Sequence, residues 1–154
     1  MTNRPKPPRI VSRVVTLNPA KDAILLVRNK DTSYWYPPGG GWEVSNGESL
    51  QEGALREVQE ECGIEVSIQN LLYLQEFHEG GKVCLEVFWL ATTIEELSAD
   101  HVDTDPNGQV EEARWVNQAE IQELKVYPIR LKDLFWEERD SIEALKSQYL
   151  LEKI

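Results

Sequence analysis

Cysteine is scarce in this chain, because Cys62 and Cys84 are the two cysteines among 154 residues. Cys62 falls on an apolar helical stripe and Cys84 lies within an apolar strand, so we expect two buried, reduced thiols in preference to a disulfide or a metal pair. No apolar run is long enough to cross a membrane, and the first residues show no secretory signal. These absences predict a cytoplasmic protein with no membrane partner.

Positive charge is also in short supply, with 16 Lys and Arg against 27 Asp and Glu, which gives a formal net charge of −11. Nucleic-acid backbones bind to basic surfaces, so this balance excludes a nucleic-acid polymer as a partner. If so acidic a protein acts on small phosphates, metal ions have to offset the repulsion between the two. The charge therefore leaves small metal-bound phosphates open as ligands.

The length and the composition, 41% hydrophobic and 28% charged residues, suit one globular domain. Residues 1–9 are rich in proline and are expected to form a disordered arm, with a single domain over 10–154. Apolar runs predict strands at residues 10–17, 23–28, 71–77, 82–93 and 112–116, with a turn at 78–81. Helices are expected at 118–124, capped by Asn117, and after Pro128, with an apolar stripe at positions 142, 145 and 149. This order of elements predicts an α/β layered domain.

The most complete local signals lie between Ser49 and Gly63. Ser49 and Glu52 have the spacing of a capping box, in which each side chain bonds the backbone amide of the other residue. Apolar residues then recur at every fourth position, which predicts a helix with one buried face; these are Leu50, Ala54, Val58 and Cys62. Gly63 supplies the left-handed residue that ends such a helix.

Three acidic residues, Glu57, Glu60 and Glu61, gather on one side of the predicted helix. Carboxylates spaced three and four residues apart repel one another by roughly 0.2–0.5 kcal/mol a pair on an exposed helix, and Arg56 cannot neutralise all of them. A divalent cation with oxygen ligands, such as Mg²⁺ or Mn²⁺, can do so. The alternative is an acidic helix face that only contacts solvent.

Three consecutive glycines, Gly39, Gly40 and Gly41, precede this helix across a short turn. Backbone amides in such a loop and at a helix N-terminus gather round phosphate oxygens. A phosphate-binding loop beside a cation-binding face favours chemistry on a diphosphate.

These residues resemble the signature of the Nudix hydrolases, G-x5-E-x7-R-E-U-x-E-E-x-G-U, where U is aliphatic. Glu48 and the run from Arg56 to Ile64 fill every position from the first Glu onward. The position five residues before Glu48 is Trp42, so we align the signature glycine with Gly40 and expect a turn over 44–47 that is two residues longer than usual. The resemblance implies the Nudix fold, a mixed β-sheet sandwiched between α-helices.

The resemblance also implies roles for particular residues. Glu57 and Glu61 match the family's metal ligands, and Glu60 matches either a third ligand or the base that deprotonates the attacking water. The carbonyl of Gly40 is implied as a further ligand, and Arg56 is implied to orient the acids. Many relatives place another catalytic acid near the last strand, where Glu112 follows Glu111.

Four residues outside the signature are candidates for substrate binding. Arg28 ends a predicted strand that leads toward the glycine loop, where it could hold a phosphate, although an exposed edge charge is equally open. Tyr34, Trp35 and Trp42 could stack on a nucleobase, with packing in the fold as the alternative.

The combined interpretation is a Mg²⁺- or Mn²⁺-dependent pyrophosphohydrolase. Its substrate is expected to be a small nucleoside diphosphate derivative, with ADP-ribose, nucleotide sugars and nucleoside triphosphates left open. The rival interpretation is a nucleotide-recognising Nudix module without turnover. The oligomeric state is open, with a homodimer as one option.

Overall fold

The computed structural model describes residues 6–97, 106, 108–144 and 149–153. Its centre is a six-stranded sheet in the order β4-β5-β1-β2-β6, with β3 paired to β1 outside this path. The strands are β1 Arg9–Leu17, β2 Ala23–Asn29, β3 Gly39–Gly41, β4 Ser67–Glu79, β5 Lys82–Thr92 and β6 Val110–Asn117. β5 runs parallel to β1 and the other pairs are antiparallel, so the sheet is mixed as predicted.

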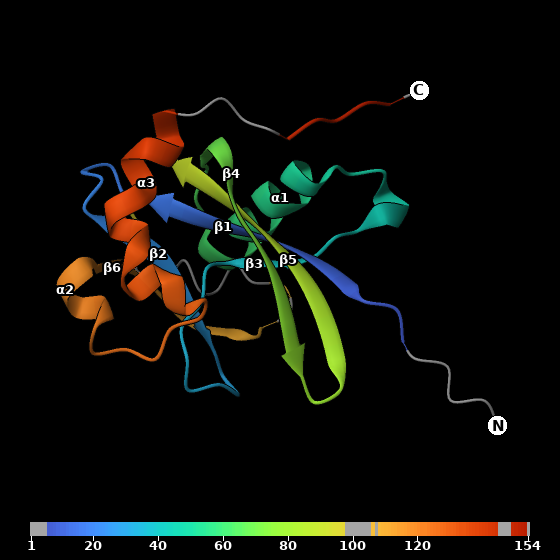
Figure 1. Ribbon diagram of the computed structural model, residues 1–154, viewed down its shortest axis with the longest axis horizontal. Coiled ribbons are helices and arrows are strands. Elements are labelled where there is room, and N and C mark those ends of the chain that lie inside the picture. Colours follow the sequence, from blue (N-terminus) through green and yellow to red (C-terminus); the bar gives the residue numbers. More distant parts are fainter. Residues whose placement is uncertain (1–5, 98–105, 107, 145–148, 154) are drawn as a thin grey trace.

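Helices cover both faces of this sheet (Figure 1). The α-helices are α1 Leu50–Cys62, α2 Gln118–Ile121 and α3 Leu134–Ala144, and two 3-10 turns cover Val44–Asn46 and Ile129–Lys132. No helix in the described ranges is long and apolar enough to cross a membrane.

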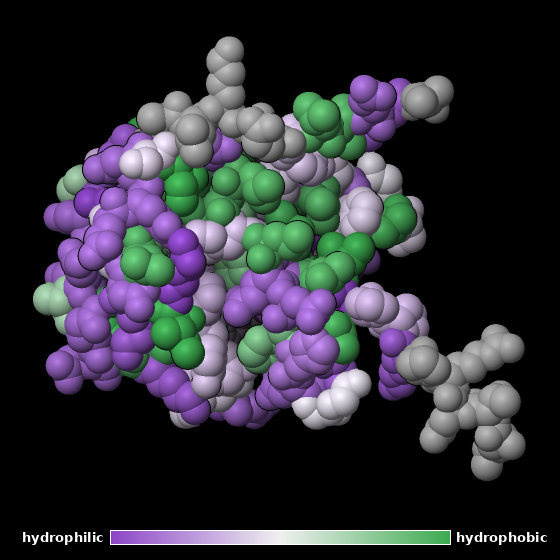
Figure 2. Space-filling view, in the orientation of Figure 1, coloured by the Kyte–Doolittle hydropathy of each residue, from purple (hydrophilic) through white to green (hydrophobic). Residues whose placement is uncertain are grey.

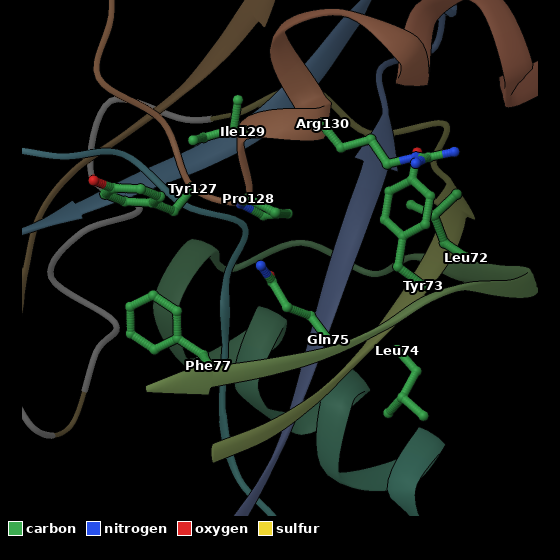
Figure 3. Close-up of a pocket in the computed structure, with 9 residues that line it drawn as sticks. All are labelled: Leu72, Tyr73, Leu74, Gln75, Phe77, Tyr127, Pro128, Ile129 and Arg130. Atoms are coloured by element: carbon green, nitrogen blue, oxygen red, sulfur yellow. The ribbon is translucent and has the colours of Figure 1, made fainter. Parts of the chain in front are cut away.

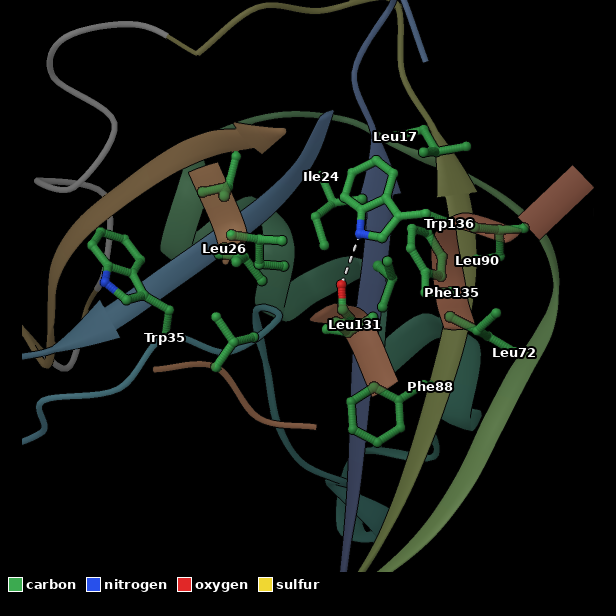
Figure 4. Packing of buried hydrophobic residues seen from close by; sticks show 14 residues of the cluster. Leu17, Ile24, Leu26, Trp35, Leu72, Phe88, Leu90, Leu131, Phe135 and Trp136 are labelled. Atoms are coloured by element: carbon green, nitrogen blue, oxygen red, sulfur yellow. Dashed lines mark hydrogen bonds between the residues drawn. The ribbon is translucent and has the colours of Figure 1, made fainter. Parts of the chain in front are cut away.

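The strands build two cores because their side chains alternate between the faces of the sheet. On β1, Val14 joins the cluster that contains Val58 of α1, whereas Val15 joins the cluster that contains Phe135 of α3. The same alternation places Trp89 of β5 on the α1 side and Phe88 on the α3 side. Figure 4 shows the α3-side cluster, where the Trp136 indole donates to the Leu131 carbonyl at 2.8 Å. The α/β sandwich is therefore confirmed.

The ends of α1 are confirmed as well. The Ser49 hydroxyl accepts from the Glu52 amide at 3.1 Å, which is one of the two bonds of the predicted capping box. Gly63 ends the helix in the left-handed conformation, with φ 67°. Local signals were sufficient here because both caps involve residues within one turn of the helix ends.

Several predicted boundaries were wrong. Arg9, assigned to the disordered arm, is the first residue of β1, while residues 1–5 lie outside the described chain. The turn after β4 is confined to Gly80 and Gly81, β4 begins at Ser67, and α2 ends at Ile121. Strand pairing with β5 extends β4 beyond its apolar segment in both directions.

The predicted C-terminal helix was also wrong in its extent. A 3-10 turn follows Pro128, and α3 starts only at Leu134. Residue 145 of the predicted stripe lies outside the described residues, and Tyr149 follows α3 to pack edge-on against Trp89, with ring centroids 4.8 Å apart. Cys62 and Cys84 are both free thiols, but Cys84 is only partly buried.

The two halves of β1 have different neighbours. Its C-terminal end pairs with β2 at Leu17 and Ile24, whereas Val11 to Arg13 pair with the glycines of β3. The residues of the first half that share a face with Val15 and Leu17 are Arg9, Val11 and Arg13, two of them charged. This part of the sheet face is not closed by the α3-side core.

In the view of Figure 2, hydrophilic residues dominate the side where α2 and α3 lie, and hydrophobic residues gather beside it over the strands. Leu74 on β4, 69% exposed, and Ile129, 62% exposed, are among the large apolar side chains open to solvent.

The turn at residues 44–47 allows a test of the alignment to Gly40. Val44–Asn46 form an exposed 3-10 turn, and bonds from the Trp42 indole and the Glu43 amide to Glu48 hold its base together. Deletion of Ser45 and Asn46 should therefore leave the fold intact, with a change in melting temperature below about 4 °C, because turn length costs little. Thermal unfolding followed by circular dichroism measures this. Loss of the cooperative transition would contradict the alignment.

Candidate active site

The candidate active site is a hollow of about 350 Å³ between β1, β3 and the acidic side of α1. Its lining combines the three glycines of β3 with charged side chains from both sides of the sheet edge; the residues are Arg9, Val11, Arg13, Asn29, Tyr36, Gly39, Gly40, Gly41, Glu43, Glu57, Glu61 and Gln109. We name this hollow the glycine hollow. It brings together two of the predicted acidic ligands and the predicted phosphate-binding glycines.

The glycine strand β3 lies directly against the carboxylates of α1. A Cβ atom on Gly40 would stand 2.5 Å from Glu57 Oε1, and one on Gly39 would stand 2.3 Å from the backbone oxygen of Ser12. The Gly39 amide donates to Glu61 Oε2 at 3.2 Å. A Cβ at position 39 would clash with the backbone of β1, so glycine is required there, whereas a Cβ at position 40 would displace the Glu57 carboxylate.

Arg56 is the centre of an ion-pair network on α1. Its guanidinium donates to both carboxylate oxygens of Glu48, at 2.9 and 3.0 Å, and one nitrogen reaches Glu57 Oε1 at 3.1 Å and Glu60 Oε2 at 3.3 Å. Glu48 also accepts from the Glu43 amide, so the chain before the helix is bound to the helix itself. The predicted orienting role of Arg56 fits this geometry.

The network shifts pKa values in opposite directions. The hydrogen bonds from Arg56 lower the pKa of Glu48 and raise that of Arg56. Burial raises the pKa of Glu57, with the charge of Glu60 acting in the same direction and Arg56 opposing them. The Glu57 side chain is only 13% exposed. The fold therefore leaves the negative charge of Glu57 incompletely balanced.

A divalent cation fits this donor set. Glu57 and Glu61 offer carboxylate oxygens beside the backbone of Gly39 and Gly40, and oxygen ligands suit hard cations. Within the described part of the chain, however, no three His, Cys, Asp or Glu side chains already lie close enough together to hold a metal. Glu60 accounts for the difference, because its carboxylate is bound to Arg56 and does not line the glycine hollow.

The structure does not bring Arg28 and Glu112 to the glycine hollow. They are direct partners across β2 and β6, and Arg28 is held by Glu111 at 2.6 Å and by Glu112 at 3.5 Å. The expectation that Arg28 points toward the glycines was wrong, because two nearby carboxylates on the adjacent strand compete for it.

Trp35 was also misplaced by the sequence pattern. It is 6% exposed and belongs to the α3-side core, with the guanidinium groups of Arg28 and Arg114 at 5.6 and 4.9 Å from the centre of its ring. The Trp42 indole is bound to the Glu48 carbonyl at the start of α1. Of the three aromatic candidates for stacking, Tyr34 alone lines a hollow near the site.

Sequence reasoning missed Arg9 and Arg13. Both line the glycine hollow, and the guanidinium of Arg9 lies so close to Gly41 that a Cβ there would stand 2.7 Å from it. Arg13 lies 3.4 Å from Glu86 and 5.0 Å from the centre of the Tyr36 ring. The available signal was a pair of arginines, one two residues before Val11 and one two residues after it, on the same face of a strand otherwise rich in apolar residues.

A larger, more apolar groove of about 590 Å³ lies between β4 and the segment from Tyr127 to Arg130 (Figure 3). Its lining contains no carboxylate, so it offers no ligand for a cation. It shares Gln75, Phe77 and Tyr127 with a small recess that borders Arg13.

Comparison with known proteins agrees with this geometry. The family described as NUDIX domain matches residues 7–136. A Mycobacterium tuberculosis protein named putative 8-oxo-dGTP diphosphatase 3 is 27% identical over 117 residues, which cover 71% of this chain and 52% of that protein. A Bacillus subtilis protein named putative 8-oxo-dGTP diphosphatase is 44% identical over 55 residues, 36% of this chain and 35% of its own.

Among solved structures, one titled UDP-X diphosphatase superposes with a TM-score of 0.68 at 21% identity, covering 94% of this chain and 68% of that one. At that identity the likeness concerns the fold. The family match spans most of the chain, so the protein belongs to the NUDIX family. The chain spans about half the length, or less, of the two named bacterial relatives.

The opposed pKa shifts predict opposite effects of two isosteric variants in the presence of a chelator. Glu48→Gln should lower the free energy of unfolding by roughly 1–3 kcal/mol at neutral pH, because Arg56 loses its charged partner. Glu57→Gln should leave stability unchanged or raise it, because it removes a buried charge. Chemical denaturation measures both.

The pH dependence provides the control. The stabilisation from Glu48, whose folded pKa is lowered, is present above the ordinary Glu pKa and is lost as pH falls through the folded value. The cost of charging Glu57 is full above its raised folded pKa, decreases as pH falls below that value, and is gone once pH lies below the ordinary Glu pKa. The two variants should therefore converge on the wild type in acid. If Glu57→Gln lowered the free energy of unfolding at neutral pH, the charge of Glu57 would not be incompletely balanced in the fold.

Proposed function

We propose that this protein is a Mg²⁺- or Mn²⁺-dependent pyrophosphohydrolase that cleaves a nucleoside diphosphate linked to another moiety. The observation that carries the proposal is the convergence of Glu57 and Glu61 on Gly39 and Gly40. Two carboxylates for a cation and a backbone free of side chains for a diphosphate lie in one hollow.

Different residues of the hollow would bind the diphosphate and the cation. Arg9 and Arg13 supply the positive charge that a diphosphate requires in a protein of net charge −11. The glycine backbone lets phosphate oxygens approach closely. A cation held by Glu57, Glu61 and the Gly40 carbonyl would neutralise the diphosphate and lower the pKa of a bound water.

Glu60 is our candidate for the base that takes the proton of the attacking water. Its carboxylate is 31% exposed and accepts a hydrogen bond from Arg56, which also contacts Glu57. Arg56 acts as a positioning residue, since it contacts Glu48, Glu57 and Glu60 at once. Water attack on one phosphorus would release a nucleoside phosphate and a phosphorylated partner, or pyrophosphate from a triphosphate.

The names of the compared proteins support a nucleotide substrate. 8-oxo-dGTP and a UDP derivative both carry a phosphoanhydride next to a nucleoside. ADP-ribose, nucleotide sugars and nucleoside triphosphates all carry the linked phosphates that the glycine hollow would bind. The rival function, a nucleotide-binding module without turnover, is disfavoured because Glu57, Glu60 and Glu61 are all retained beside Arg56.

A substrate screen tests the proposal. The protein should hydrolyse at least one diphosphate-containing nucleotide in the presence of Mg²⁺ or Mn²⁺ and none with a chelator, as read by mass analysis of the products. Glu57→Gln and Glu61→Gln should each lower kcat by orders of magnitude. The matched control is Glu52→Gln, an exposed acid in the first turn of the same helix, which should keep wild-type activity.

Thermal melts separate the enzyme from its rivals. Saturating Mg²⁺ should stabilise the wild type by about 2.7 kcal/mol at a hundredfold excess over Kd, provided the unfolded chain does not bind it. Both ligand variants should gain much less than Glu52→Gln. If Mg²⁺ stabilised both variants as much as the wild type, the acidic face of α1 would only contact solvent. If nucleotides bound without any turnover, the recognition module would be favoured.

A further inference from the structure

The outer edge of β4 is open along a stretch that is regular enough to pair with another strand. β4 is the end strand of the sheet, and no strand among the described residues lies beyond it. Its pairing with β5 shifts register twice before Tyr73 and is regular from there to Glu79. This regular stretch presents a row of backbone N–H and C=O groups on which a further strand can form.

The apolar groove between β4 and the segment from Tyr127 to Arg130 follows this edge. Successive side chains of a strand point to opposite faces of the sheet. In Figure 3, Tyr73 and Gln75 point toward the segment and Leu74 points away from it, yet all three line the groove. A groove lined by residues of both faces runs along the edge of the strand.

Apolar side chains are exposed on both walls of the groove. Leu74 on β4 is 69% exposed, and Ile129 on the opposite wall is 62% exposed. Folded proteins protect a sheet edge from other chains by bulges, prolines or charged residues. On β4 the irregular pairing lies before Tyr73 and the charged residues lie after Gln75, so the middle of the edge has no such protection.

Charge is distributed unevenly over the two walls. Residues 67–75 of β4 contain no charged side chain, whereas the end of the strand carries Glu76 and Glu79. Residues 125–132, which include the opposite wall, contain three basic residues and no acid, in a chain with 27 acidic and 16 basic residues. A partner strand that runs antiparallel to β4 and ends in acids matches this pattern, and a second copy of β4 has these properties.

One register of β4 against itself suits these side chains. A pairing centred on Gln75 opposes Tyr73 to Phe77 and Leu74 to Glu76 of the second copy, all within the regular stretch. A centre at Glu76 would oppose this acid to itself, and like charges in directly opposed positions are destabilising. A centre at Leu74 would draw in the part of β4 where the register shifts.

This register also brings opposite charges together. Opposing Tyr73 to Phe77 of the second copy directs the next residue on the same face, Glu79, toward Arg130. The Arg130 guanidinium lies 5.3 Å from the centre of the Tyr73 ring, and its side chain is 48% exposed although Glu138 binds it. The acidic end of each strand therefore meets the basic wall of the other copy.

We propose that β4 is the interface between two copies of this chain, paired antiparallel about a two-fold axis at Gln75. In such a contact both copies use the same surface, and their two sheets join into one. The occupant is a second copy, and not an unrelated peptide, because this chain supplies both the acidic end and the basic wall. The proposal is independent of the proposed function, since none of residues 73–77 lines the glycine hollow.

Charge exchange at Gln75 tests the axis. Sedimentation equilibrium of the full chain should show a dimer. Gln75→Glu and Gln75→Lys each place like charges opposite one another, so each should raise the dimer dissociation constant about fivefold or more. An equimolar mixture opposes a carboxylate to an ammonium group and should recover at least the wild-type affinity. General repulsion between acidic chains cannot explain weakening by Gln75→Lys, which lowers the net negative charge.

Leu74 and Ile94 provide a matched pair of variants. Leu74→Glu should weaken the dimer because it opposes a second acid to Glu76, whereas Leu74→Lys should strengthen it. Ile94→Glu adds the same charge at an apolar residue that is 96% exposed and lies outside the groove, and it should leave the dimer unchanged. Circular dichroism checks that each variant is folded.

Three results would overturn the proposal. The first is a wild type that stays monomeric up to millimolar concentration. The second is a dimer that persists unchanged in both Gln75→Glu and Leu74→Glu, since it would use another surface. The third is a mixture of the two Gln75 variants that associates no better than either alone, since residue 75 would then not meet its own copy. Recovery of the dimer only in the mixture supports the two-fold axis at Gln75.

Discussion

The packing of β3 against α1 is the contact on which the rest of the site depends. Three glycines form an edge strand without side chains, so the carboxylates of Glu57 and Glu61 can reach past it to the face of β1 that carries Arg9 and Arg13. Any side chain on Gly40 would occupy the position of the Glu57 carboxylate. Acidic and basic groups from opposite faces of the sheet therefore meet in one hollow.

The surroundings of Glu57 at this contact disfavour its ionised form. Burial and the charge of Glu60 disfavour ionised Glu57, and Arg56 compensates only in part while it is shared with Glu48 and Glu60. Such an incompletely balanced anion is typical of a site that is completed by a cation. The bond between Glu48 and Arg56 fixes the chain before α1 to the helix, and the exposed turn at residues 44–47 lies outside this contact.

The two halves of β1 divide one face of the sheet into a packed part and a part that opens to solvent. Near the pairing of β1 with β2, Val15 and Leu17 pack in the core beneath α3. Where β1 pairs with β3, the same face of the strand carries Arg9 and Arg13, which line two neighbouring hollows. The α3-side core requires bulky aromatic residues such as Phe135 and Trp136. Tyr34, Phe77 and Tyr127 lie at the boundary and are left partly exposed.

The sequence by itself determined the family, the layered fold, and the start and end of α1. Its signals were local: a cap at Ser49, a stop at Gly63, and acids spaced by helical turns. Only the tertiary structure decided that Arg28 pairs with Glu111 and Glu112, that Trp35 is buried, and that Arg9 and Arg13 face the glycines. These placements depend on which strands are neighbours in the sheet, and residues far apart in the chain meet through pairings that no local pattern encodes.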